Sequence, residues 1–460
     1  MSRLVVISNR VGPFKDTGKA GGLAVALVDV LKANGGLWFG WSGEISDQGT
    51  FGTLNKETFG KVELATIDMT QDDYDEFYIG YANQALWPTL HYRLDLADFD
   101  RRFEAGYRRM NERLASRVHP MLQDNDTIWV HDYHFFHVGS NLRQMGVKNP
   151  IGFFLHIPFP VPEILSALPN SHGFVRQMLA YDLIGFQTQR DADALIRYLK
   201  EEAGGRVLSD GRIEANGRAV DIRAFPIGID TAGFAKAATG AEARRNEQKV
   251  RRLLGDREQI IGVDRIDYSK GLPQRLKAFA KLLEDYPENR NKVSLMQVAP
   301  PSRSELDAYQ DIRHELESLA GHVNGRFAEL DWTPIRFMTR GMSRRTLAGV
   351  YRASRVGFVT PLRDGMNLVA KEYIAAQNKD DPGVLVLSRF AGASEELQEA
   401  LQVNPYSDVE MAEALQSALR MPLDERQERW ARLFERISKH DAANWAQSFI
   451  SNLERAAQRR

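Results

Sequence analysis

The stretch from residue 360 to residue 377, TPLRDGMNLVAKEYIAAQ, combines residue types that can bind a phosphorylated ligand. Gly365 permits a tight turn, and Asn367 can cap a helix that continues through residue 377. The backbone N–H groups of Leu368 and Val369 would then be unpaired and directed outward. Because a helix start favours negative charge, this turn predicts a phosphate site.

Glu372 is four residues beyond Leu368 and therefore on the same helix face. A phosphate at the helix start would place a nucleoside ribose about one turn away, where the carboxylate of Glu372 can accept hydrogen bonds from two hydroxyls. Asp364, just before the turn, can accept hydrogen bonds from sugar hydroxyls. The alternative is a capped structural helix with a solvated glutamate; we favour the ligand site.

Arg265 and Lys270 lie five residues apart in one loop, and Pro273 suits the first turn of a helix over residues 272–286. Two cations beside a helix start form a site for a diphosphate, and each charge-assisted hydrogen bond there is worth about 1.5–3 kcal/mol. The alternative is a pair of solvated surface cations.

A Gly-rich turn at residues 18–23 precedes a helical pattern, and Gly21 and Gly22 would let backbone N–H groups approach an anion closely. The turn matches neither the dinucleotide-binding fingerprint nor a Walker loop, which argues against a dinucleotide ligand. A flexible loop is the alternative.

Arg10, Tyr78, Trp87 and Arg303 make a second candidate site, for an anion and a sugar. A guanidinium offers a bidentate fork to phosphate, and aromatic faces stack on sugar rings. The alternative is that the two aromatic residues belong to the core.

Three histidines, His131, His134 and His137, lie close together with Asp132 between them. The H-x-x-H pattern can ligate zinc, but no third ligand has a firm spacing and H-E-x-x-H is absent. We therefore expect these groups to bind sugar hydroxyls, and we predict no metal.

Short apolar runs must position these residues, and they alternate with longer amphipathic stretches. Runs that are apolar on both faces are typical of buried parallel strands, and their alternation with helices predicts an α/β protein with doubly wound sheets. Six runs end in polar or charged residues, which would surround one or two clefts at the carboxyl ends of the strands. The runs are residues 4–7, 37–41, 62–67, 127–130, 151–155, 183–186, 220–225, 259–263, 293–298, 356–359 and 384–387.

Residues 200–226 break this alternation, because Asp210-Gly211 and Asn216-Gly217 separate short β-prone runs and predict a hairpin or meander. A polar segment rich in Ala, Gly and Arg follows, so we place a domain boundary near residue 232. The last segment, 442–457, has helical spacing with its apolar residues on one side, and it could pack on either domain.

Composition limits the class of protein. The 460 residues exceed one ordinary core, so two or three domains are expected. With 60 Lys and Arg against 61 Asp and Glu, the net charge is −1, which leaves no global positive field for nucleic acid or an acidic membrane. The chain has no Cys, which excludes disulfides and favours a reducing compartment. No apolar run approaches the ~18 residues of a membrane span, and we expect a soluble, cytoplasmic protein.

Long motifs along the chain, from near residue 3 to about residue 455, resemble the trehalose-6-phosphate synthase family. They are SNR at 8–10, AGGLA at 20–24, WFGWSG at 38–43, LWP at 86–88 with HYR at 91–93, WVHDYH at 129–134, FFLHIPFP at 153–160, DRIDYSKGL at 264–272, AYQDIRH at 308–314 and TPLRDGMNLVAKEY at 360–373. The resemblance implies a retaining enzyme of GT-B fold that transfers glucose from UDP-glucose to glucose 6-phosphate.

The resemblance also implies two Rossmann-like domains that face each other across a cleft. Residues 1–232, with a returning helix over 442–460, would bind the acceptor, and residues 233–441 would bind the nucleotide sugar. The donor residues that it implies are Gly21, Gly22, Arg265, Lys270, Met342, Asp364, Leu368, Val369 and Glu372. The acceptor residues that it implies are Arg10, Trp41, Tyr78, Trp87, Asp132 and Arg303. The expected catalytic residues are Arg265, Lys270, Asp364 and His156.

Retention without an obvious covalent nucleophile suggests front-face substitution, in which the leaving diphosphate takes the proton of the acceptor. UDP-glucose is then a co-substrate, and no cofactor or metal is expected. The alternatives are a glucosylglycerol-phosphate synthase, a relative that couples cyclitols, a catalytically silent regulator that binds sugar phosphate, and a hydrolase that uses Asp132 and Asp364. The sequence is compatible with a homo-oligomer but does not determine the oligomeric state. It does not determine the base of the donor nucleotide either.

Overall fold

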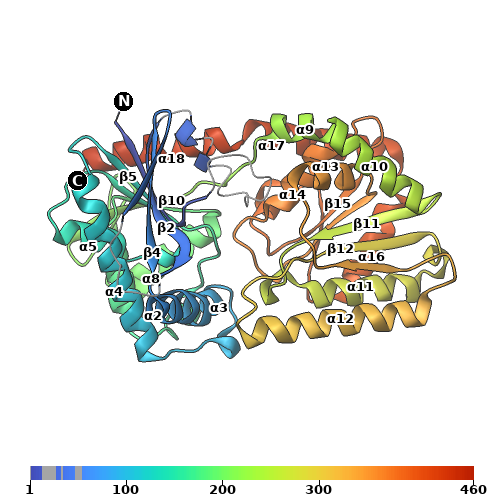
Figure 1. The fold of residues 1–460 in the computed structure, drawn as a ribbon, viewed down its shortest axis with the longest axis horizontal. Helices are drawn as coiled ribbons and strands as arrows, with labels where there is room; N and C mark the ends of the chain where they lie inside the picture. Colours follow the sequence, from blue (N-terminus) through green and yellow to red (C-terminus); the bar gives the residue numbers. More distant parts are fainter. Residues whose placement is uncertain (1, 13–26, 29, 33–34, 47–53, 460) are drawn as a thin grey trace. The chain divides into compact units, whose positions relative to one another are not determined.

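The computed structural model describes residues 2–12, 27–28, 30–32, 35–46 and 54–459. The chain divides into two compact units, the first made of residues 1–226 and 443–460 and the second of residues 227–442 (Figure 1). The boundary expected from the sequence, near residue 232, falls in α9 (Thr231–Ala238), the first helix of the second unit.

Within the described part of the first unit, ten strands form one sheet in the order β3-β4-β2-β1-β5-β6-β7-β10-β9-β8. The strands from β4 to β10 in this order pair in parallel, whereas β3, β9 and β8 pair antiparallel. Their bounds are β1 Leu4–Arg10, β2 Gly36–Ile45, β3 Asn55–Phe59, β4 Val62–Met69, β5 Thr127–His131, β6 Ile151–Phe154, β7 Leu183–Phe186, β8 Arg206–Val207, β9 Ile213–Ala215 and β10 Arg218–Ala224. The predicted hairpin is confirmed, because Asn216 and Gly217 turn the chain between β9 and β10 with positive φ angles of 51° and 74°.

The second unit holds a six-stranded parallel sheet in the order β13-β12-β11-β14-β15-β16. Its strands are β11 Glu258–Val263, β12 Val293–Val298, β13 Ile335–Met338, β14 Val356–Val359, β15 Val384–Ser388 and β16 Leu401–Val403. The chain builds outward from β11 on one side and from β14 on the other, so the strand order reverses between these two strands. The same reversal occurs between β1 and β5 in the first unit. Each unit is therefore doubly wound around one topological switch point.

Helices cover the sheets as the amphipathic stretches predict. The helix expected over 272–286 is α11 (Leu272–Asp285), and Pro273 does lie in its first turn. One segment has a winding that the sequence did not indicate: residues Tyr74–Leu86 form a π-helix. The other helices are α2 Gln71–Asp73, α3 Trp87–Leu90, α4 Arg101–Val118, α5 Val138–Gln144, α6 Pro162–Leu165, α7 Ser171–Met178, α8 Gln189–Glu202, α10 Ala241–Leu254, α12 Asp307–Phe327, α13 Arg344–Arg352, α14 Leu368–Ala376, α15 Ala393–Glu396, α16 Asp408–Arg420, α17 Leu423–Lys439 and α18 Ala442–Gln458.

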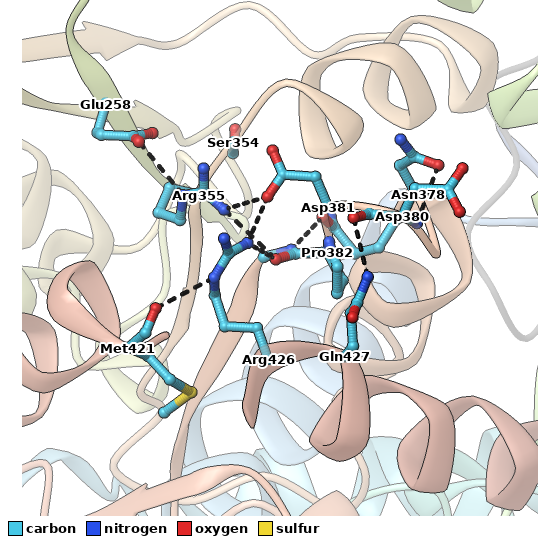
Figure 2. A network of polar contacts seen from close by, with 12 residues as sticks. Glu258, Ser354, Arg355, Asn378, Asp380, Asp381, Pro382, Met421, Arg426 and Gln427 are labelled. Carbon is cyan, nitrogen blue, oxygen red and sulfur yellow. Dashed lines mark hydrogen bonds and ion pairs between the residues drawn. The ribbon is translucent and has the colours of Figure 1, made fainter. Parts of the chain in front are cut away.

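A polar network fastens α17 to the loop that precedes β15 (Figure 2). Arg426 of α17 donates to Asp381 at 2.6 Å and to the carbonyl of Pro382. Arg355, just before β14, donates to the same carboxylate at 2.9 Å. Arg426 is buried, and its charge is compensated by Asp381, whose side chain is partly exposed to water.

The final helix, α18, packs in the first unit, which confirms the predicted return. Phe449 is fully buried, and its ring centroid lies 4.6 Å from that of Trp129 and 5.2 Å from that of Phe225. Gly152 and Gly185 make this close approach possible, because a Cβ on either would lie within 2.8 Å of the Phe449 ring. The helix therefore lies directly on β6 and β7.

We expect Phe449→Ala to lower the free energy of unfolding by about 3–5 kcal/mol, because it removes a fully buried ring from this contact. Urea denaturation followed by circular dichroism measures the loss. Ser448→Ala, on the exposed side of the same helix, is the control and should change the stability by less than about 0.5 kcal/mol. Equal effects of the two substitutions would show that α18 does not stabilise the first unit through its apolar face.

Candidate active site

The strand ends beside the switch point of the second unit carry polar groups. β11 leads directly into Asp264 and Arg265, and β14 leads into Thr360 and then Asp364. In doubly wound sheets, ligands bind at the carboxyl ends of the strands where the strand order reverses. This edge of the sheet is therefore the candidate ligand site of the second unit.

One ion pair joins these two strand ends. Lys270 Nζ lies 2.5 Å from Asp364 Oδ2, and 12% of each side chain is exposed. The amide of Asn367 donates to Asp364 at 3.1 Å and to Asp264 at 3.3 Å, which links the loop after β14 to the loop after β11. Two of the predicted donor residues, Lys270 and Asp364, are thus in direct contact.

Arg275, on α11, supports this pair from inside the protein and is fully buried. Its guanidinium donates to Asp264 at 2.8 Å and to the hydroxyl of Thr360 at 3.2 Å. Burial raises the pKa of Asp264, while the charge of Arg275 acts in the opposite direction. Since a buried charge is stable only when it is paired and hydrogen-bonded, the Arg275 contacts hold both loops in place.

The side chain of Asn367 does not cap the helix, as we had expected it to do. The residue occupies the N-cap position of α14 in a left-handed conformation, with φ 70°, but its side chain makes no capping hydrogen bond. The two aspartates engage the amide nitrogen, and Oδ1, the atom that would cap the helix, makes no hydrogen bond within the described residues. The first N–H groups of α14, at Leu368 and Val369, are therefore left without a side-chain cap, which is the condition for binding an anion there.

Glu372 lies one turn further along α14 and is partly buried. Within the described residues its carboxylate makes no hydrogen bond. Burial raises the pKa of Glu372 to about 7, and the charge of Arg344 opposes this rise in part. An unpaired carboxylate with restricted access to water is well suited to accept hydrogen bonds from a ligand hydroxyl.

Arg265 and Met342 complete the described part of the predicted donor set. Arg265 is exposed, and among the described residues its guanidinium has neither an ion pair nor a hydrogen bond. Met342 lies in the loop between β13 and α13 and is partly buried. The other two predicted donor residues, Gly21 and Gly22, lie outside the described residues.

An aromatic cluster in the first unit collects three of the predicted acceptor residues. The guanidinium of Arg10 lies 5.6 Å from the ring centroid of Trp41, and Trp41 lies 5.5 Å from Tyr78. Tyr78 stacks on Tyr74 at 5.3 Å, and both come from the π-helix. The hydroxyl of Tyr78 makes no hydrogen bond within the described residues. A cation, an aromatic face and a hydroxyl thus lie together, as binding of a sugar phosphate requires.

A pair of histidines lies across the ends of β5 and β6. His131 Nδ1 and His156 Nε2 are 3.0 Å apart, and His156 Nδ1 lies 3.4 Å from the amide of Gln187. The backbone N–H of His156 donates to Asp132, which has a left-handed φ of 74°. Burial lowers the pKa of His156 to about 3, so its ring is neutral near pH 7. The ring is therefore a hydrogen-bonded group without charge.

Two other predicted acceptor residues make different contacts. Trp87 is buried at the start of α3 and stacks on His91 at 4.2 Å. Arg303 belongs to the second unit, where it contacts Asp267 and Tyr309.

No group of three or more metal-ligating side chains that could hold an ion is found in the part of the chain that the structure describes. In the same part, no helix is long and apolar enough to cross a membrane.

Two doubly wound α/β units, each with polar groups beside its switch point, are the architecture of the GT-B fold. The chain belongs to glycosyltransferase family 20, whose pattern matches residues 6–455. The family resemblance and the fold expected from the motifs are therefore confirmed.

Similar proteins match this chain from end to end. A trehalose-6-phosphate synthase of Cronobacter sakazakii is 47% identical over 460 residues, which are 100% of this chain and 96% of the relative. A UDP-forming alpha,alpha-trehalose-phosphate synthase from Burkholderia xenovorans, solved in complex with glucose-6-phosphate, is 47% identical with a TM-score of 0.95 and covers 98% of this chain and 100% of its own. An E. coli structure bound with UDP-2-fluoro glucose is 46% identical with a TM-score of 0.94 and covers 98% of this chain and 99% of its own.

Two residues that shape the sites, Asp267 and Tyr309, were missing from the sequence-based set of site residues, and His131, expected to bind sugar hydroxyls, bonds to another histidine instead. Asp267 and Tyr309 hold Arg303, and His131 holds His156. All three belong to motifs that carry the family resemblance, and those motifs were the available signal. The contacts of Asp267 and His131 join segments 36 and 25 residues apart in the sequence, which no local pattern reveals.

We expect Glu372→Gln to raise the melting temperature at pH 8 and to have progressively less effect as the pH falls toward 4.5. The folded-state pKa of about 7 is above the ordinary value of 4.5, so the ionised carboxylate destabilises the folded state at pH values above 7. Thermal unfolding at pH 5, 6.5 and 8 measures the change. Glu413→Gln, at an exposed position on α16, is the control. A gain that is equal at pH 5 and pH 8 would contradict a buried, ionised Glu372.

Proposed function

We propose that this chain transfers glucose from UDP-glucose to glucose 6-phosphate with retention and forms alpha,alpha-trehalose 6-phosphate. The observation that carries this proposal is the pair of ligands in the two end-to-end relatives. A chain 47% identical holds glucose-6-phosphate, and a chain 46% identical holds UDP-2-fluoro glucose.

The second unit would bind the donor. Arg265 and Lys270 are assigned to the diphosphate, together with the uncapped helix start at Leu368 and Val369, and Glu372 is assigned to the ribose. The ion pair with Lys270 orients Asp364, which we assign to hydroxyls of the donor glucose. Gly21, Gly22 and Met342 are assigned to the donor on the family resemblance alone.

The first unit, with α18, would bind the acceptor. Arg10, Trp41 and Tyr78 form a cluster with a cation, an aromatic face and a hydroxyl, which supports an assignment to the sugar phosphate. Asp132 is assigned to an acceptor hydroxyl. Trp87 and Arg303 complete the set of residues proposed to bind the acceptor.

The proposed reaction is a front-face substitution at C1 of the donor glucose. As the bond from C1 to the diphosphate oxygen breaks, the acceptor oxygen forms its bond to C1 on the same face, and its proton passes to the departing diphosphate oxygen. Arg265, Lys270 and the start of α14 would stabilise the charge that develops on the diphosphate. The neutral ring of His156 would lie beside the donor sugar without taking up the proton.

In this proposal UDP-glucose is a co-substrate, and the chain needs neither a resident cofactor nor a metal. The two cations and the helix start supply the positive charge that a divalent ion would otherwise supply. We place the reaction in the cytoplasm, where the sugar phosphate acceptor is available, and we assign no role to nucleic acid or membranes.

The proposal predicts that the purified protein releases UDP and forms a disaccharide phosphate from UDP-glucose and glucose 6-phosphate. Parallel incubations with ADP-glucose, GDP-glucose and glycerol 3-phosphate define the donor base and the acceptor. Mass spectrometry identifies the product, and NMR coupling constants establish its anomeric configuration. Loss of donor without a disaccharide phosphate would indicate a hydrolase, and a product only from glycerol 3-phosphate would indicate the smaller acceptor.

We expect Arg265→Ala to lower turnover by roughly 10²–10³, because it removes one of the cations that stabilise the leaving diphosphate. The fold should survive, since Arg265 is exposed and lacks a partner among the described residues. Arg245→Ala, which removes an exposed arginine from α10, is the matched control and should keep normal turnover. A folded Arg265→Ala protein with near-normal turnover would rule out the assigned role.

A further inference from the structure

Arg303 has a conformation that needs support. Its φ is 47°, in the left-handed region that residues with a side chain rarely adopt, and only 7% of its side chain is exposed. Such a conformation persists only where surrounding contacts hold it, and it is frequent at functional sites.

Two buried side chains provide that support. The guanidinium of Arg303 donates to the hydroxyl of Tyr309, and this hydroxyl donates in turn to Asp267 Oδ2 at 3.3 Å. The same oxygen of Asp267 lies 3.5 Å from Arg303 Nη1. The guanidinium carbon also lies 5.5 Å from the centre of the Tyr309 ring. Burial raises the pKa of Tyr309, so the hydroxyl keeps the proton that it donates.

The other oxygen of Asp267 serves a different segment. Oδ1 accepts hydrogen bonds from the backbone N–H of Ser269 at 2.9 Å and from its hydroxyl at 2.8 Å. These bonds close the turn that ends at Lys270. Asp267 has no exposed surface, so one buried carboxylate holds both the turn that carries Lys270 and the side chain of Arg303.

We propose that Asp267 and Tyr309 are positioning residues that orient the guanidinium of Arg303 toward the phosphate of the acceptor. This inference rests on the proposed function. A planar guanidinium held through one nitrogen and one face has its plane fixed, and bidentate recognition of phosphate depends on that plane. The hydroxyl of Tyr309 contacts Arg303 and the Oδ2 of Asp267, whereas the turn of Lys270 is closed by the Oδ1 of Asp267. Removal of that hydroxyl leaves the Oδ1 bonds in place. Loss of Tyr309 should therefore affect only the acceptor, and loss of the Asp267 charge should affect both substrates.

The experiment is a double-mutant cycle on Tyr309→Phe and Arg303→Ala. Calorimetry in the presence of UDP gives the dissociation constant of glucose 6-phosphate, and steady-state kinetics gives KM and kcat. We expect Tyr309→Phe to raise the dissociation constant and KM for glucose 6-phosphate roughly five- to tenfold, with kcat changed much less and with UDP affinity unchanged. In the Arg303→Ala background, Tyr309→Phe should have no further effect. Asp267→Asn should weaken both glucose 6-phosphate and UDP.

Tyr373→Phe is the matched control, because it also removes the hydroxyl of a buried tyrosine in the same unit, bonded there to the carbonyl of Ser354 at 3.1 Å. It should leave the affinity for glucose 6-phosphate unchanged. An equal loss in the control, or a full effect of Tyr309→Phe in the Arg303→Ala background, would overturn the positioning role. A wild-type protein that forms no product with glucose 6-phosphate would instead contradict the proposed function, before any variant is compared. If Asp267→Asn does not fold, the Tyr309 cycle still decides the question.

Discussion

The ion pair between Lys270 and Asp364 joins the two strands at which the second sheet reverses its order. The carboxyl ends of β11 and β14 leave the sheet side by side, and each sends a loop over the same edge. Backbone hydrogen bonds from Leu362 and Arg363 to the carbonyl of Ser269 join these loops at one point. The pair, together with the amide of Asn367, holds them at a fixed spacing, and the start of α14 follows directly from it.

This arrangement carries an energetic cost that the neighbouring residues offset. Desolvation of charged groups is unfavourable, and a buried ion pair contributes little unless its remaining donors and acceptors are satisfied. The buried guanidinium of Arg275 donates a hydrogen bond to Asp264. The carboxylate of Asp267 accepts a hydrogen bond from the backbone of the turn that carries Lys270. Asp264 and the turn of Lys270 are thus held by contacts that lie deeper in the protein. Arg265 and Glu372 are exceptions among the described residues, because neither side chain has a hydrogen bond or an ion pair there.

The sheet of the first unit also reverses its strand order at one point, but the side chains there are of a different chemical kind. Its switch point carries a cation over an aromatic cluster and a neutral, hydrogen-bonded histidine pair. Aromatic faces and uncharged donors suit a sugar ring, whereas the helix start and cations of the second unit suit a diphosphate. The proposed division between acceptor and donor follows from this contrast in chemistry.

Much of the fold was predictable because buried parallel strands have a strong local signature. The runs at residues 4–7 and 356–359 became central strands, and the hairpin at Asn216 followed from its turn dipeptide. The short strands β13 and β16 were missed, since their flanking residues give no clear apolar run. The π-helix over Tyr74–Leu86 was also missed, because its residues do not distinguish it from an α-helix.

The sequence by itself determined the class of fold, the strand ends that carry polar groups and the family, because each depends on residue types at short, regular spacing. Only the tertiary structure decided how those groups are paired. Asn367 bonds to two aspartates and leaves α14 uncapped, Asp267 holds both Arg303 and the turn of Lys270, and the ring of His156 is neutral. These properties arise from burial and from contacts between distant segments, and no local pattern encodes either one.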